Sequence, residues 1–192
     1  MPSEKAGLAK VQELYEQRDA RAKELQRQGK KVIGYLCSFV PVEFITAVDM
    51  VPYHIMGNVR DPITEADEYI ENNLCPYVRN TFDQAIKGQY KFLDGLVIAH
   101  ACDTVQRIYG LWRYYFPPAY SHFVNAPHTT SPSSLKFFKE ELVFFKESLE
   151  KFAGQEMAEE RLRDAIRLHN ESRALVRDLY ELRKQDPPLI SG

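Results

Sequence analysis

Short apolar runs alternate with longer amphipathic stretches through the first two thirds of the chain. Four of these runs have the length of a strand and are bounded by turn formers or helix starts. Alternation of strands with helices predicts βαβ units, so we expect an α/β fold with a small, mostly parallel, doubly wound sheet. The four predicted strands lie within residues 32–36, 50–56, 92–99 and 120–124.

The segments between these runs repeat apolar residues at steps of three and four, which is typical of helices that bury one face. We expect helices at 41–48, from Pro76 to a stop at Gly88, and from Asp103 to the break at Pro117. The acidic segment 61–73 is rich in turn formers and predicts a surface loop.

Three further helices are expected outside this alternation. Residues 4–28 predict one amphipathic N-terminal helix that ends at Gly29, and a long packed stripe predicts a helix from Ser131 to Gly154. A second long helix is expected at 156–184. The last two are too long for crossovers in a small sheet, so we expect them to brace one face or to lead toward another domain. The predicted buried side of the last helix holds Leu162, Ile166, His169, Val176, Leu179 and Leu182.

A chain of 192 residues predicts one ordinary domain. We divide it into an N-terminal helix (1–30), an α/β domain (31–130), a long helical pair (131–186) and the start of a linker to an absent second domain (187–192). The net charge of −2 disfavours nucleic acid and anionic membrane surfaces as partners. The start is polar and no apolar run is long enough to span a membrane, so we expect a cytoplasmic protein.

Three cysteines fall at corresponding places in the predicted fold. Cys37 follows the first strand, Cys75 precedes a helix where unpaired N–H groups favour a thiolate, and Cys102 follows the third strand. Ligands of open α/β sheets bind at the carboxyl ends of strands, and all three residues are expected at that edge. The odd number and wide spacing argue against disulfides, zinc ribbons and ferredoxin motifs. Two alternatives stay open: small buried hydrophobic residues, or metal ligands completed by another group.

Five segments, taken in order, resemble the 2-hydroxyacyl-CoA dehydratase and benzoyl-CoA reductase family, over a match from about Val32 to Gly192. The order and spacing of the segments together carry the resemblance. They are GYLCSFVPVE at 34–43, AVDMVP at 47–52, CPYVR at 75–79, DGLV at 94–97 and CDT at 102–104.

The resemblance implies a subunit that uses an oxygen-sensitive [4Fe–4S] cluster for radical chemistry on a CoA thioester. It implies that Cys37 and Cys75 are two of three cluster ligands and that the third cysteine normally comes from a second, C-terminal α/β domain. Cys102 lies in a family motif that is not normally a ligand, with recruitment of Cys102 in a compact variant as the alternative. A homologous second subunit and a separate ATP-hydrolysing activator are implied as partners. The alternatives are a non-catalytic binding or assembly domain of the same fold and a zinc-binding domain.

Several weaker candidates accompany the cysteines. His100 follows the third strand and is a candidate donor to a cluster sulfur or substrate oxygen, against the commoner role of a structural histidine. Arg79 and Arg107 are candidates for CoA phosphates, against solvated helix faces. An aromatic-rich stretch from Tyr109 to Tyr120 is a candidate seat for an aromatic acyl group, against core or interface packing. No phosphate-binding loop is found, so ATP hydrolysis is not built into this chain.

Overall fold

A four-stranded, all-parallel sheet forms the centre of the computed structural model, which describes the backbone of residues 4–190 and the side chains from residue 9 to residue 190. The strand order is β2-β1-β3-β4, so the predicted parallel α/β sheet is confirmed. The strands are β1 (Val32–Leu36), β2 (Val51–His54), β3 (Gly95–Ala99) and β4 (Tyr120–Val124).

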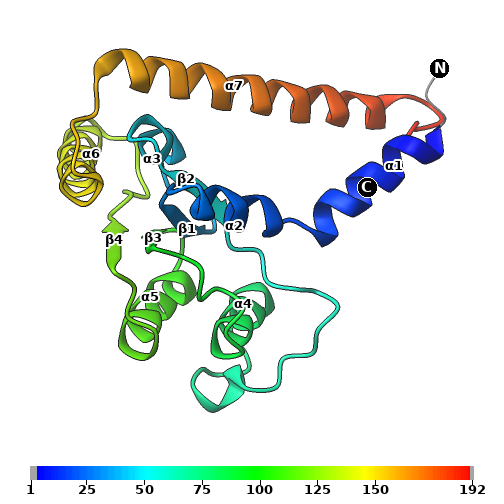
Figure 1. The fold of residues 1–192 in the computed structure, drawn as a ribbon, viewed down its shortest axis with the longest axis horizontal. Coiled ribbons are helices and arrows are strands. Elements are labelled where there is room, and N and C mark those ends of the chain that lie inside the picture. The colour runs from blue at the N-terminus through cyan, green and yellow to red at the C-terminus, as the bar shows by residue number, and fades with distance from the viewer. Residues whose placement is uncertain (1–3, 191–192) are drawn as a thin grey trace.

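Helices cover both faces of the sheet, which makes the fold doubly wound (Figure 1). One apolar core cluster joins the sheet to α2, α4 and α5, and a second joins it to α3, α6 and α7. These helices are α2 (Ala20–Arg27), α3 (Val42–Ala47), α4 (Pro76–Ile86), α5 (Asp103–Tyr115), α6 (Pro132–Ala153) and α7 (Glu159–Glu181).

The two central strands are closely packed because small residues lie where they meet their neighbours. Every residue of β3 is buried, as are four of the five residues of β1. A Cβ atom at Gly34 would lie 2.6 Å from Leu93 Cδ1 and 2.8 Å from Ile55 Cδ1, so only glycine fits there without a shift. Pro52 lies on the edge strand β2, as a residue without an N–H donor must.

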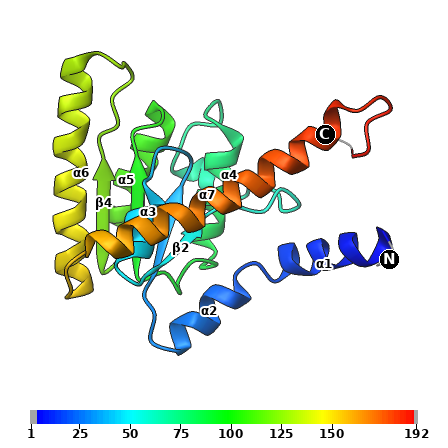
Figure 2. The same cartoon turned by 90° about the horizontal axis from the view of Figure 1, so that it is seen from above.

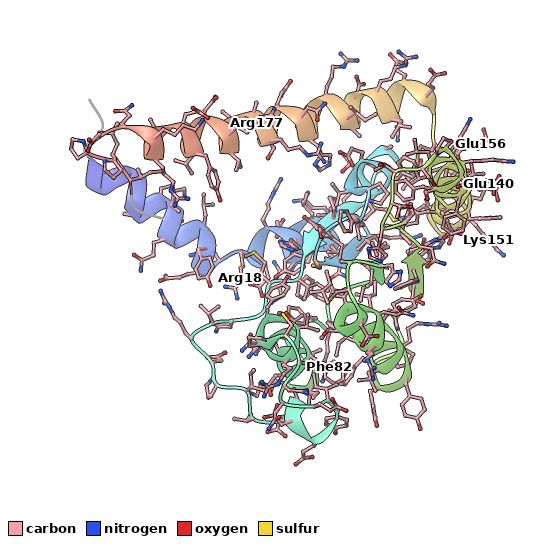
Figure 3. The ribbon with its side chains drawn as sticks, turned by 180° about the vertical axis from the view of Figure 1, so that it is seen from behind. Arg18, Phe82, Glu140, Lys151, Glu156 and Arg177 are labelled. Atoms are coloured by element: carbon pink, nitrogen blue, oxygen red, sulfur yellow. The ribbon has the colours of Figure 1, made fainter. Side chains whose placement is uncertain are left out.

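The N-terminal segment forms two helices, and the prediction of one continuous helix was wrong. α1 (Glu4–Glu16) and α2 are separated by a turn at residues 17–19. Arg18 lies in this turn (Figure 3), and its guanidinium donates to Tyr15 O at 3.0 Å and to Gly57 O at 3.1 Å. The second bond joins residues far apart in the chain, so local periodicity gave no sign of it.

The acidic segment is a loop, as predicted, with one short 3-10 turn, η1 (Ala66–Glu68). The loop is fixed by Asp83 of α4, whose side chain is fully buried. Asp83 Oδ1 accepts hydrogen bonds from the backbone N–H groups of Thr64, Glu65 and Ala66 at 2.9, 2.7 and 3.1 Å. Lys87 Nζ lies 2.5 Å from the other oxygen. Burial alone would raise the pKa of Asp83, but Lys87 and the three amides hold it below its ordinary value.

Of the two long C-terminal helices, α6 has the predicted ends, whereas α7 begins and ends three residues inside the predicted range 156–184 and lacks the predicted burial. Ser131 caps α6 by accepting from Ser134 N at 3.2 Å, and Gly154 ends it in the left-handed conformation. In α7 the predicted buried residues Ile166, Val176 and Leu179 are 41%, 51% and 51% exposed. α7 packs mainly on the short helix α3, so it buries only a narrow face, and its C-terminal part continues past α3 (Figures 1 and 2).

After α7 the chain makes a 3-10 turn, η2 (Leu182–Lys184). The predicted linker at 187–192 is described only to residue 190, and residues 191 and 192 lie outside the described residues. In the described part of the chain, no helix is both long and apolar enough to cross a membrane.

Candidate functional site

The strand order places a topological switch point beside Cys37. From β1 the chain goes to β2 on one side, and later to β3 on the other. Ligands of doubly wound sheets bind in the crevice outside the carboxyl ends of the strands at such a point. Cys37 follows β1 directly, and Cys102 lies three residues beyond β3, so both are at this edge as predicted.

The turn that carries Cys37 has an unusual backbone. Cys37 and Phe39 have φ angles of 63° and 69°, in the left-handed region that favours glycine. Placing a residue other than glycine in this region costs roughly 1–2 kcal/mol of conformational energy. Cys37 is half-buried, and its Sγ lies 3.8 Å from Ser38 Oγ. The turn therefore holds a thiol at the sheet edge at a conformational cost, which is a common property of ligand-binding turns.

Tyr77 connects the start of α4 to the end of β2. Cys75 occupies the N-cap position of α4, and Tyr77 lies in the first turn of the helix. The Tyr77 hydroxyl donates to Ile55 O at 2.7 Å and lies 3.5 Å from His54 Nε2. Tyr77 and Cys37 also pack against the same core cluster. The helix start with the exposed Cys75 is thereby held at the edge where Cys37 lies.

Burial raises the pKa of Tyr77 to about 12, and the neighbouring Cys37 adds to this. At neutral pH the phenol therefore keeps its proton and acts as a hydrogen-bond donor.

An imidazole and an ion pair complete this edge. The His54 ring stacks on Tyr35 with the centroids 4.9 Å apart and an interplanar angle of 15°. Burial by these neighbours lowers the pKa of His54, which favours a neutral ring at pH 7. Arg173 Nη2 of α7 lies 2.5 Å from Glu43 Oε1 of α3, and the charges of this pair act on the half-buried Tyr35. α7 is thus tied to the helix that follows Cys37.

The three cysteines are free thiols, and no group of three or more Cys, His, Asp and Glu side chains within the described residues is placed to hold a metal ion. Thiolates are the ligands that iron–sulfur clusters use. Cys37, Cys75 and Cys102 each have the chemistry of such a ligand and none is sealed in the core, so exposure alone does not choose between them. A complete cluster site needs at least one further ligand from outside the described residues.

The other predicted residues have partners of their own. His100 packs edge-to-face on His128, with the ring centroids 4.7 Å apart. Arg79 is paired with Asp67 and donates to Asn72 O at 2.9 Å, and Arg107 Nε lies 2.7 Å from an oxygen of Asp103. Both arginines are thus engaged within the chain, so the CoA-phosphate interpretation gains no support.

The aromatic-rich stretch is not one surface. Trp112 and Tyr120 belong to core clusters on opposite faces of the sheet, and Tyr114 is 79% exposed. The cause is the end of α5 at Tyr115, after which the chain turns into β4 and the side chains separate. Core packing explains the two buried rings.

Sequence reasoning missed His54 and Tyr77 as site residues. His54 is the last residue of β2, so its place at the carboxyl end of a strand was a usable signal. The role of Tyr77 depends on a contact with Ile55 across the sheet edge, and no local pattern indicates such a contact.

Comparison with known proteins gives a consistent result. The family model described as "2-hydroxyglutaryl-CoA dehydratase, D-component" matches residues 37–192. A benzoyl-CoA reductase subunit of Thauera aromatica is 29% identical over 94% of this chain and 48% of its own length. The beta subunit of (R)-2-hydroxyglutaryl-CoA dehydratase from Acidaminococcus fermentans is 28% identical over 85% of this chain and 44% of its own length.

A third relative, the (R)-phenyllactyl-CoA dehydratase beta subunit of Clostridium sporogenes, is 25% identical over 88% of this chain and 45% of its own length. The chain therefore spans just under half the length of these curated relatives. All three relatives are subunits of enzymes that are named for CoA compounds. On the match over residues 37–192, the chain belongs to the 2-hydroxyglutaryl-CoA dehydratase D-component family.

Proposed function

We propose that this chain is the N-terminal, cluster-binding part of a CoA-thioester enzyme subunit that catalyses either dehydration of a 2-hydroxyacyl-CoA or reduction of benzoyl-CoA. Cys37 and Cys75 hold a [4Fe–4S] cluster together with a third ligand from outside the described residues. The observation that carries the proposal is the position of Cys37 at the switch point, where Cys37 packs against the same core cluster as Tyr77 in the first turn of the helix that Cys75 begins. When bound, the cluster would supply one-electron transfer to the thioester.

The residues around the thiols orient and enclose this edge. Tyr77 fixes the end of β2 by donating to Ile55 O, and His54, stacked on Tyr35, offers a neutral imidazole beside it. The Glu43–Arg173 pair holds α7 against α3. A neutral imidazole is able to accept a proton at a ring nitrogen near pH 7.

The chain has no phosphate-binding loop, so the electron is proposed to come from a separate ATP-hydrolysing activator, and a homologous second subunit is proposed as the partner. Three free thiols are in keeping with a reducing cytoplasm.

A second candidate is a non-catalytic binding or assembly domain of the same fold. The observation that favours it is the lack of a three-ligand group among the residues that the structure describes. The two candidates differ in iron content, because only the first needs a cluster.

The test is anaerobic purification with any partner chain retained, followed by iron, sulfide and visible absorption measurements. We expect iron and sulfide in the intact protein, loss of most of both in Cys37→Ser and Cys75→Ser, and no loss in Cys102→Ser, the matched control at the same edge. Turnover of a set of CoA thioesters with the activator and a strong reductant then identifies the acyl group. A colourless, iron-free protein under these conditions would favour the assembly domain.

A further inference from the structure

A cavity of about 280 Å³ opens at the edge of the sheet opposite to the cysteines. It lies between the C-terminal ends of α4 and α5 and the beginning of β3, where Gly95 and Leu96 form part of its wall. The cysteines lie beyond the other end of the strands, about 13 Å away along β3. This cavity is therefore separate from the proposed cluster site.

Aromatic rings form the walls of the cavity and are fixed by their neighbours. Trp112 is 4% exposed, and the Tyr90 ring stacks on it with the centroids 5.8 Å apart. The Phe116 ring packs edge-to-face on Trp112 with the ring centroids 6.4 Å apart. The Tyr90 hydroxyl accepts a hydrogen bond from Gly57 N at 3.1 Å. Pro117 and Pro118 form a stiff rim. The cavity is thus preformed, with a volume near the lower limit of small-molecule sites at about 300 Å³.

One charged residue lines this apolar space. Lys91 is the only charged residue among the eleven that line the cavity. Its side chain folds over the turn at Gly88, where an added Cβ would lie 2.9 Å from Lys91 Cε. The neighbouring Lys87 is paired with Asp83, whereas Lys91 forms no ion pair with any residue from 9 to 190. An apolar pocket with one unpaired cation complements a ligand with an apolar body and one anionic group.

We propose that this cavity is a second binding site, for a small aromatic or aliphatic carboxylic acid in its ionised form. The apolar body packs between Trp112, Phe116 and Ala85, and the carboxylate pairs with the Lys91 ammonium. Because the wall includes the first residues of β3 and the last turn of α4, an occupied site stabilises the sheet and the helix that Cys75 begins.

Trp112 provides the readout, because it is the only tryptophan in the chain. Phenylacetate, phenylacetamide and phenethylamine share one body and differ in charge, so titrating each into the full chain separates the carboxylate from the apolar group. We expect a saturable change in tryptophan fluorescence with phenylacetate and a dissociation constant on the order of 1 mM. Binding of the neutral and cationic probes should be at least about threefold weaker.

Two variants test the assignment. Lys91→Met should remove the preference for phenylacetate over phenylacetamide, whereas Lys151→Met on the exposed side of α6 (Figure 3) should keep it. Ala85→Leu should fill the cavity and abolish the fluorescence change; if this variant fails to fold, Lys91→Met alone decides. Three outcomes would each overturn the proposal. They are equal binding of all three probes, no saturable fluorescence change at a phenylacetate concentration about ten times the expected dissociation constant, and an unchanged preference for phenylacetate in Lys91→Met.

Discussion

At the scale of single residues, the candidate site depends on a few side chains that connect segments far apart in the sequence. Tyr77 is the clearest case, since its hydroxyl joins the first turn of α4 to the carbonyl of Ile55 after β2. The place of Cys37 at the end of a strand was predictable from an apolar run of five residues. Its positive φ was not, because Cys37 itself carries no sign of a left-handed turn.

Tyr77→Phe should leave the Ile55 carbonyl without its side-chain donor and keep the ring packing. We expect a loss of about 1 kcal/mol in the free energy of unfolding, the usual net value of one partly buried hydrogen bond. Urea denaturation measures this loss of free energy. The control is Tyr114→Phe, which removes a hydroxyl from a residue that is 79% exposed. Equal stability of the two variants would show that the Tyr77 hydroxyl does not support the site edge.

Two glycines give opposite expectations for the same substitution. Gly34→Ala places a Cβ 2.6 Å from Leu93 Cδ1 in the packed centre of the sheet, and overpacking of this kind costs about 1–3 kcal/mol. Gly110 lies in α5, and a Cβ atom added there would have nothing within 4 Å. Gly110→Ala should therefore raise the free energy of unfolding by about 0.5–1 kcal/mol, because alanine has the higher helix propensity. Thermal denaturation of both variants should shift the midpoint in opposite directions.

At the scale of elements, Asp83 of α4 holds the loop that leads from β2 to Cys75. Its buried carboxylate binds three consecutive backbone amides and Lys87, so the loop has a fixed path without a strand or a long helix of its own. Asp83→Asn removes the charge and turns one oxygen into a donor. We expect the free energy of unfolding to fall by about 2–3 kcal/mol, which is in the range for a broken hydrogen bond to a buried charged group.

The pH dependence gives a second measurement of the same contact. The folded state lowers the pKa of Asp83, so its stabilising effect is complete above the ordinary value of 3.8 and is lost as the pH falls through the folded value. Urea denaturation below pH 4 should therefore show a steeper loss of stability in the parent than in Asp83→Asn. Asp178→Asn, on an exposed part of α7, is the control and should follow the parent.

The strands and most helices were predictable because their signals are local. β-branched runs, Ser131 with Pro132, and Gly154 each act within a few residues. Two errors share one cause. The turn between α1 and α2 contains Arg18, which is bonded to the distant Gly57, and α7 presents an apolar face where the described chain offers no partner. Periodicity shows that a face is apolar, but not what covers it.

At the scale of the whole molecule, the core is concentrated at the sheet, and α7 reaches beyond it. The N-terminal half of α7 contains its one buried residue, Ala165, while Leu175, Val176 and Leu179 near its end are 71%, 51% and 51% exposed. Helical stability in proteins comes mainly from packing of an apolar face, so the two halves of α7 should differ.

Amide hydrogen exchange followed by mass spectrometry checks this difference. Peptides from β1 and β3 should exchange slowest, those around Ala165 at an intermediate rate, and those from 174 to 181 fastest, because local opening there exposes little buried surface. Adding the homologous second subunit proposed above should slow exchange at 174–181 if that subunit covers these side chains, and should leave β3 unchanged. Uniform protection along α7 in the chain alone would contradict the packing argument, since it would require stabilisation that the described contacts do not provide.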